Sequence, residues 1–204
     1  MRAARKILAA ASYAAVLGLA ITSPASATLL TNGDFETGAF APGWTFVGSL
    51  TSVVSGQFFG INGPESGTYY VAMGNPGCCG TISQTISDTP GDALVLTYWL
   101  AGDGSNPSYF DVLWNGTTIN GSEETNFNSS GVFQQFTFDL VGTGTDTLMF
   151  RERDDPFYLG LDNVSLDIRA ATVVPEPGTL ALLGLGLMGT FAGRRYARKP
   201  KEQA

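Results

Sequence analysis

Short apolar runs separated by Gly, Pro, Asn and Asp dominate the middle of this 204-residue chain. Apolar and polar residues alternate along most runs, as in half-buried β-strands, and no long helical period is present. The segment 94–100 is apolar on both faces and predicts a central strand, while Asn115-Gly116 predicts a hairpin turn. Further strands are expected around 110–114, 135–140, 147–151 and 161–168. Short strands with turns about every ten residues predict an all-β antiparallel sandwich or jelly roll.

The first 27 residues have the order of a secretory signal peptide. A basic start with Arg2, Arg5 and Lys6 precedes the apolar, Ala-rich run Ile7–Ile21. A small-residue A-x-A site follows at Ala25–Ala27, which is the kind of site that signal peptidase cuts. We therefore expect an N-terminal signal helix, export, and removal of residues 1–27. The alternative is a retained membrane anchor.

A second apolar run, Gly178–Gly193, lies near the C-terminus. Its length is near the lower limit for a transmembrane helix across a bilayer of about 30 Å. The triplet Pro175, Glu176 and Pro177 ends a linker at 171–177, and its prolines keep it extended and exposed to an enzyme. A basic tail follows at 194–204, where Arg194 and Arg195 are expected to stop the helix and stay in the cytoplasm. The alternative is an ordinary tail anchor that is never cleaved.

This order of triplet, apolar run and basic stop resembles the PEP-CTERM sorting signal of bacterial envelope and matrix proteins. The resemblance implies export across the inner membrane of a Gram-negative-type bacterium and a membrane-anchored intermediate. It also implies processing at or near the triplet by an exosortase-type enzyme. The delivered domain would then reside at the cell surface or in the extracellular matrix.

Removal of both ends leaves a single domain at 28–170 with a strongly acidic composition. This segment has 16 Asp and Glu against three Arg and no Lys, which gives a net charge of −13. Such a surface excludes nucleic acid as a partner, because nucleic acid needs clustered Lys and Arg. The chain has no His, which removes the Ser-His-Asp triad and His-based zinc sites.

Paired acids at Glu123-Glu124 and Asp154-Asp155 raise the possibility of glycoside hydrolysis, which uses two carboxylates. Neighbouring residues on a strand point to opposite faces, so neither pair forms a dyad by itself. We therefore expect no enzymatic activity. Cys78 and Cys79 are also adjacent, and in an oxidising compartment they could form a vicinal disulfide, pair between chains, or stay as thiols.

The order of several motifs resembles the galactose-binding-like jelly roll, which many non-catalytic carbohydrate-binding modules share. The motifs are LLTNGDFETG at 29–38, GTISQTIS at 80–87, FDVLWNGTTI at 110–119, FQQFTFDLVGTG at 133–144 and LGLDNVSLDI at 159–168. Together they cover nearly all of 29–168. The resemblance implies two antiparallel sheets, with the first and last strands side by side and often a structural calcium ion where they meet.

In the resembling modules, acids of the opening and closing motifs bind this calcium. Carried over, the ligands are Glu36 and Asp162, with Asp34 as a third candidate or a turn cap. Calcium takes about six to eight oxygen ligands, and converging carboxylates repel one another unless a cation lies among them. The alternative is that these acids are turn and strand-end residues that bond to the backbone.

A glycan site needs aromatic platforms for sugar faces and a few polar groups. Most of the aromatic candidates for such a site are expected in the core instead. The candidates are Trp44, Trp99, Tyr109, Trp114, Phe157 and Tyr158. If a site is present, we expect Trp99, Asp103, Tyr109 and Arg151 to form it. Two functions stay open: a glycan- or exopolysaccharide-binding module, or a structural or adhesive envelope protein without a discrete pocket, stabilised by calcium.

Overall fold

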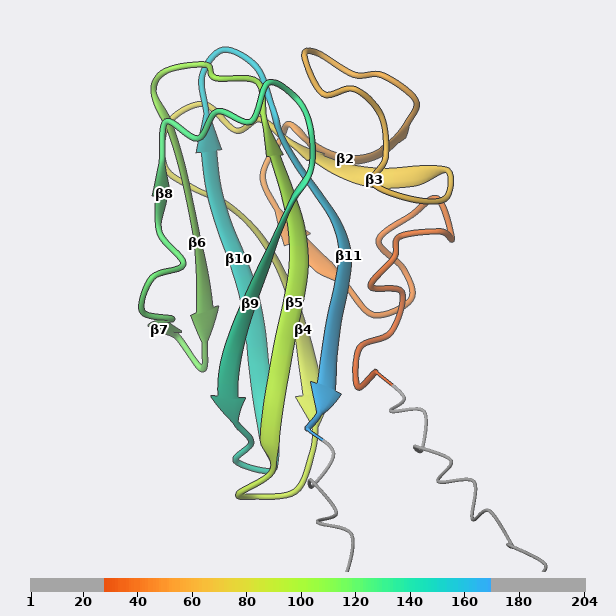
Figure 1. Ribbon diagram of the computed structural model, residues 1–204, viewed down its shortest axis with the longest axis vertical. Helices are drawn as coiled ribbons and strands as arrows, with labels where there is room; N and C mark the ends of the chain where they lie inside the picture. The colour runs from red at the N-terminus through yellow and green to blue at the C-terminus, as the bar shows by residue number, and fades with distance from the viewer. Residues whose placement is uncertain (1–27, 170–204) are drawn as a thin grey trace, which may run out of the picture. The chain divides into compact units, whose positions relative to one another are not determined.

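The computed structural model describes residues 28–169, which form eleven β-strands in two antiparallel layers (Figure 1). One sheet has the order β1-β4-β10-β6-β7, with β8 also paired to β6, and the other has the order β2-β3-β11-β5-β9. The predicted all-β antiparallel sandwich is confirmed. The strands are β1 (Thr45–Val47), β2 (Thr51–Ser55), β3 (Tyr69–Met73), β4 (Gly80–Ser87), β5 (Ala93–Gly102), β6 (Ser108–Trp114), β7 (Thr117–Thr118), β8 (Glu124–Thr125), β9 (Gln134–Val141), β10 (Thr145–Asp154) and β11 (Leu159–Ile168).

The terminal predictions lie outside the described residues. They comprise the signal peptide at 1–27, the linker with Pro175, Glu176 and Pro177, the transmembrane helix at 178–193, and the tail that begins with Arg194 and Arg195. Among residues 28–169, no helix has the length and apolarity needed to span a membrane.

The core lies between the two sheets and follows the alternation of the sequence. On β5, Tyr98 is fully buried, whereas its neighbour Trp99 is half-buried on the outer face. The Tyr98 ring lies 5.8 Å from the ring of Phe110 and 5.4 Å from that of Phe150, both on the opposite sheet. Burial of each large apolar side chain stabilises the fold by about 1.5–3 kcal/mol. The predicted central strand is confirmed, because β5 lies between β11 and β9.

The opening segment 28–33 runs beside the last strand, β11. The Leu29 amide donates to the Leu166 carbonyl at 2.7 Å, and the Val164 amide donates to the Gly33 carbonyl at 2.8 Å. Only glycine fits at position 33, because a Cβ there would lie 2.0 Å from the Val164 carbonyl oxygen. The two ends of the domain therefore meet as the resemblance implied, although β1 itself belongs to the other sheet.

The sequence predictions about one turn and two core tryptophans have different outcomes. Asn115 and Gly116 have φ values of 53° and 78° and join β6 to β7, which confirms the hairpin turn. Trp44 is buried, as expected for a core anchor, and its indole N–H donates to the Asn32 carbonyl at 2.8 Å. Trp114, expected in the core, is only half-buried and donates its indole N–H to the Val141 carbonyl at 3.2 Å.

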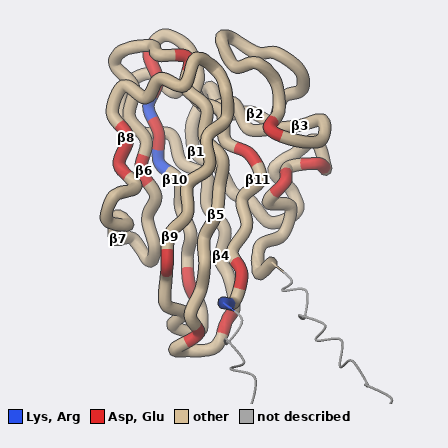
Figure 2. Tube along the Cα trace, viewed as in Figure 1, with Lys and Arg blue, Asp and Glu red and all other residues tan. Residues whose placement is uncertain are grey.

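Acidic residues are spread over both sheets and the loops of the described domain, as Figure 2 shows. Arg151 forms an ion pair with Asp111, and Arg153 forms one with Asp155 at 2.9 Å. Five of the sixteen acids are buried and the other eleven are partly or fully exposed, so acidic residues still outnumber basic ones on the folded surface.

Candidate functional site

Five loops gather at one end of the sandwich, the upper end in Figure 1, which we term the loop end. They are the segments 56–68, 74–79, 103–107, 126–133 and 155–158. The first of these also covers part of the outer face of the β2-β3-β11-β5-β9 sheet. There Ile61 and Tyr70 form a second, smaller apolar cluster outside the main core, against which Phe133 packs.

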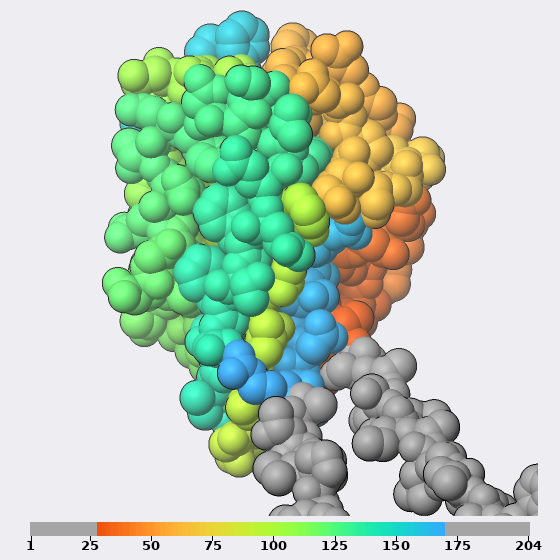
Figure 3. Space-filling model, in the orientation of Figure 1, coloured from red at the N-terminus to blue at the C-terminus, as the bar shows by residue number. Residues whose placement is uncertain are grey.

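A groove of about 250 Å³ opens on that outer face beside the loop end. Trp99 of β5 lies between two walls, one formed by residues 62–65 and the other by residues 131–133. Figure 3 shows the face that carries β5, a narrow yellow-green strip between β9 and β11. Asn62 and Glu65 supply an amide and a carboxylate, and Phe133 supplies a second aromatic ring. Each polar group also bonds within the protein through one atom, Asn62 to the Ser130 carbonyl at 3.1 Å and Glu65 to the Asn163 side-chain amide. The groove therefore combines aromatic surface with a few polar groups and has no basic residue in its lining.

A buried carboxylate, that of Asp162, holds the wall at 62–65 through hydrogen bonds to the backbone at its end. Asp162, the cross-strand partner of Trp99, accepts hydrogen bonds from the Glu65 amide at 2.9 Å and the Ser66 amide at 3.5 Å. Burial raises the pKa of Asp162 to about 7, against the opposing effect of its backbone hydrogen bonds. Asn163, next in the chain, donates its side-chain amide to the Glu65 carboxylate and to the Ser66 hydroxyl.

The three predicted calcium ligands lie around the same segment. Glu36 Oε1 accepts the amides of Tyr69 at 2.9 Å and Thr68 at 2.8 Å, and these bonds lower the pKa of Glu36. Asp34 accepts the Glu36 amide at 3.3 Å, the contact of a turn cap. Glu36 and Asp162 thus bind the two ends of the segment 65–69 through its backbone. Within residues 28–169, no group of three or more Asp, Glu, Cys or His could hold a metal ion.

The structure does not bring the four predicted glycan-binding residues together. Trp99 and Asp103 belong to β5 and the loop after it, whereas Tyr109 and Arg151 lie on β6 and β10 of the other sheet. Arg151 Nε donates to Asp111 Oδ1 at 2.8 Å, and its guanidinium lies 5.8 Å from the centre of the Tyr109 ring. Its hydrogen bonds to Asp111 hold the pKa of Arg151 above its usual value.

The two acid pairs lie in different surroundings, and the loop with the paired cysteines contacts one of them. Glu123 accepts the Tyr109 hydroxyl at 3.2 Å, and burial raises the pKa of Glu124. Cys78 and Cys79 are joined by a disulfide in the loop 74–79, where the Gly77 amide donates to Asp155 at 3.3 Å. Asp154, in contrast, is buried at the end of β10.

An aromatic surface at the loop end was only partly predicted. Phe58 and Ile61 close a tight turn through reciprocal backbone bonds of 3.0 and 2.9 Å, with Phe59 at its tip. The φ of Phe59 is 37°, which is rare for a bulky residue, and its side chain is 57% exposed. Its ring lies 5.3 Å from that of Tyr158 and 6.5 Å from that of Phe157. The sequence pointed to Phe157 and Tyr158, but the only local signal for Phe59 is the glycine after it.

A second groove, of about 670 Å³, lies along the edge strands β1 and β2. Phe40 and Phe46 stack there at 4.5 Å, and Phe46 is 49% exposed. Most of its polar groups are already bonded within the protein; the Thr45 hydroxyl, for instance, bonds to Ser83. This edge therefore offers apolar surface but few free hydrogen-bonding groups.

Comparison with known proteins gives the fold of the described domain and a sorting signal at the C-terminal segment. The described domain has the jelly-roll fold of carbohydrate-binding modules. It is similar to TmCBM61 in complex with beta-1,4-galactotriose, with 19% identity, a TM-score of 0.54, and coverage of 71% of this chain and 100% of that one. It is also similar to the CBM22-1 xylan-binding domain from Paenibacillus barcinonensis Xyn10C, with 17% identity, a TM-score of 0.52, and coverage of 74% and 100%.

The C-terminal segment has its own match. The model of the PEP-CTERM protein-sorting motif matches residues 173–199, so this chain carries that sorting signal, as its sequence predicted. No curated protein matches the chain. The signal implies export through a membrane-anchored intermediate and processing by exosortase.

Proposed function

We propose that this chain is an exported, non-catalytic protein that binds a neutral glycan or exopolysaccharide of the cell surface or matrix. The observation that carries the proposal is the Trp99 groove. Its indole provides an apolar face for a sugar ring, while Asn62 and Glu65 provide hydrogen-bonding groups at the rim. The related folds support the ligand class, since one structure holds a galactotriose and the other is a xylan-binding domain.

Charge favours a neutral ligand over an acidic one. The domain has a net charge of −13, and the groove lining includes Glu65 but no Arg or Lys. An anionic polysaccharide would be repelled by this surface, whereas a neutral one would not. Trp99 also lies near the loop end, while residue 169, from which the sorting tail continues, follows the opposite end of β11. The groove is therefore distant from the point where the tail is attached.

The proposal predicts that Trp99→Ala weakens binding to neutral polysaccharides. Loss of a central aromatic contact typically costs about 2 kcal/mol or more, roughly a thirtyfold change in Kd. A glycan array would first identify a ligand, and titration calorimetry would then compare the variants. Tyr109→Ala is the matched control, because Tyr109 lies on the other sheet and should leave the affinity unchanged.

Two results would count against this function. No binding to any neutral glycan by the folded protein would favour the alternative, a structural or adhesive envelope protein. Equal binding by wild type and Trp99→Ala would place the ligand elsewhere. Phe46→Ala and Phe59→Ala would then test the edge groove and the exposed aromatic surface.

A further inference from the structure

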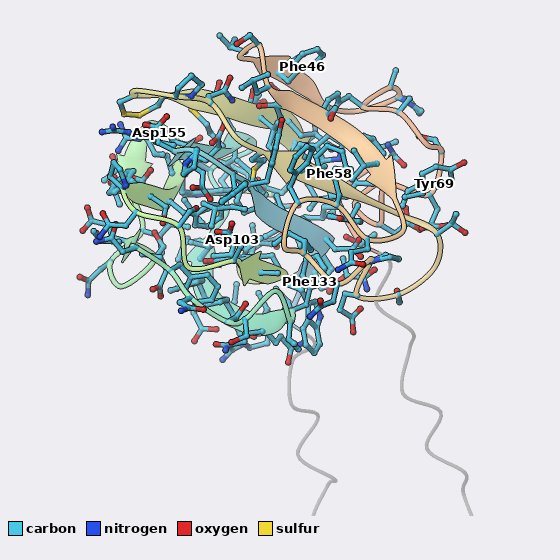
Figure 4. All side chains as sticks on the ribbon, turned by 90° about the horizontal axis from the view of Figure 1, so that it is seen from above. Phe46, Phe58, Tyr69, Asp103, Phe133 and Asp155 are labelled. Atoms are coloured by element: carbon cyan, nitrogen blue, oxygen red, sulfur yellow. A yellow bond between two sulfur atoms is a disulfide. The ribbon has the colours of Figure 1, made fainter. Side chains whose placement is uncertain are left out.

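Two carboxylates, Asp103 in the loop after β5 and Asp154 at the end of β10, share one hydroxyl at the loop end. Asp103 Oδ1 lies 2.7 Å from the Ser105 hydroxyl and also accepts the Ser105 amide at 2.8 Å. The same hydroxyl contacts Asp154 Oδ1. A serine hydroxyl has a single proton, so it can donate to only one of the two carboxylates. Figure 4 shows Asp103 among the loops, between Asp155 and Phe133.

Two further oxygens in this cluster have no hydrogen-bond partner. Asp154 Oδ2 and the Ser108 hydroxyl are both buried and unpaired, and their residues are only 1% and 3% exposed. Asp154 and Ser108 are direct partners across β10 and β6, so their side chains share one face of the sheet. Burial of a carboxylate oxygen without a donor or a cation is costly.

The cationic side chains near this cluster are already engaged elsewhere. Arg153 bonds to Asp155 through both Nε and Nη2 at 2.9 Å, and Arg151 pairs with Asp111. Burial raises the pKa of Asp154, and the negative charges of Asp103 and Asp155 raise it further. The cluster therefore has an excess of buried oxygen and negative charge over donors.

We propose that Asp103 and Asp154, together with the hydroxyls of Ser105 and Ser108, bind a calcium ion. Calcium accepts carboxylate, hydroxyl and water oxygens at about 2.3–2.6 Å in flexible geometry, which suits ligands from two sheets. Asp103 and Ser105 are half-buried, so water can complete the coordination. With only two carboxylates, we expect a Kd on the order of 10⁻⁴–10⁻³ M, the range of extracellular calcium modules.

The ion would join loops that frame the groove. Gly60 packs directly on Asp103, since a Cβ on Gly60 would lie 2.7 Å from the Asp103 Cβ. Asp103 also forms a backbone bridge with Asn128. Calcium at this position would therefore hold the turn at 58–61 and the loop at 126–133 against the end of β5. The site does not depend on glycan binding, and it is distinct from Glu36 and Asp162.

The test is calcium titration of the chelator-treated full chain, by calorimetry and by melting temperature. Saturable binding is expected, with a melting temperature that rises with calcium concentration. Asp154→Asn and Asp103→Asn should each weaken this binding at least tenfold, whereas the control Glu36→Gln should retain it. If Asp154→Asn fails to fold, the half-exposed Asp103→Asn provides the same comparison.

Two outcomes would overturn the site. The first is no saturable calcium binding by wild type. The second is a calcium affinity that is unchanged in both Asp154→Asn and Asp103→Asn, whether or not Glu36→Gln lowers it.

Discussion

Single buried carboxyls set the response of this domain to pH. Burial raises the pKa of Glu152 and Asp162 to about 7 and that of Asp154 to about 6. In the unfolded chain these groups titrate near pH 4. The folded state therefore binds more protons between pH 4 and 7, and its stability falls as pH rises through this window. Groups with lowered pKa values, such as Glu36 and Asp155, affect stability only at lower pH.

We predict a higher melting temperature at pH 5 than at pH 8 when both are measured in chelator. Each kcal/mol of stability corresponds to roughly 2–4 °C for a domain of this size. Glu152→Gln should flatten this dependence, because Glu152 is fully buried and its carboxylate accepts bonds from Asn75 and Thr51. A melting temperature that is flat or rises from pH 5 to 8 would contradict this assignment.

The segment 65–69 is anchored at both ends by carboxylates, Asp162 at one end and Glu36 at the other. We predict that Glu36→Gln increases hydrogen exchange at the Thr68 and Tyr69 amides, because the neutral amide is a weaker acceptor than the carboxylate. The change in stability should be small, about 1 kcal/mol. Asp167→Asn is a surface control that should leave both amides unaffected. Unchanged protection in Glu36→Gln would show that this contact does not hold the loop.

The strands were predictable from sequence because their signal is local. Alternation about Phe110 and Phe150 fixes which side chains face inward, and Asn115-Gly116 fixes a turn. The alternation of positions along a strand does not reveal which sheet the strand joins. For this reason the sequence predicts one glycan site with both Trp99 and Tyr109, although these residues lie on different sheets.

The groove and the shared-hydroxyl cluster could not be predicted in the same way. The groove walls at 62–65 and 131–133 are distant in sequence and meet only through packing around Ile61 and Phe133. Asp103 and Asp154 likewise come together only when the two sheets stack. Asp103 was singled out from sequence, but as part of a glycan site.

At the scale of the whole molecule, the sorting signal decides where the acidic domain is delivered. The motif at 173–199 predicts that the chain is cut at or near Pro175-Glu176-Pro177 in a host with an exosortase. Mass spectrometry of the C-terminus should find the apolar run and basic tail absent from the mature protein. In a host that lacks the sorting enzyme, the intact tail should remain in the membrane fraction. An intact C-terminus in both hosts would identify an ordinary tail anchor.

The proposed function rests on a neutral glycan that binds over Trp99. The protein has three tryptophans, which allow this contact to be measured directly. The indole N–H groups of Trp44 and Trp114 are bonded to the carbonyls of Asn32 and Val141, while Trp99 lies in the groove. Indole N–H resonances of the ¹⁵N-labelled protein, assigned by single Trp→Phe variants, would be followed during titration with the best glycan from the array. A saturable shift of the Trp99 signal, with the signals of Trp44 and Trp114 unmoved, is the predicted result. Saturable binding that leaves the Trp99 signal unchanged would contradict the account.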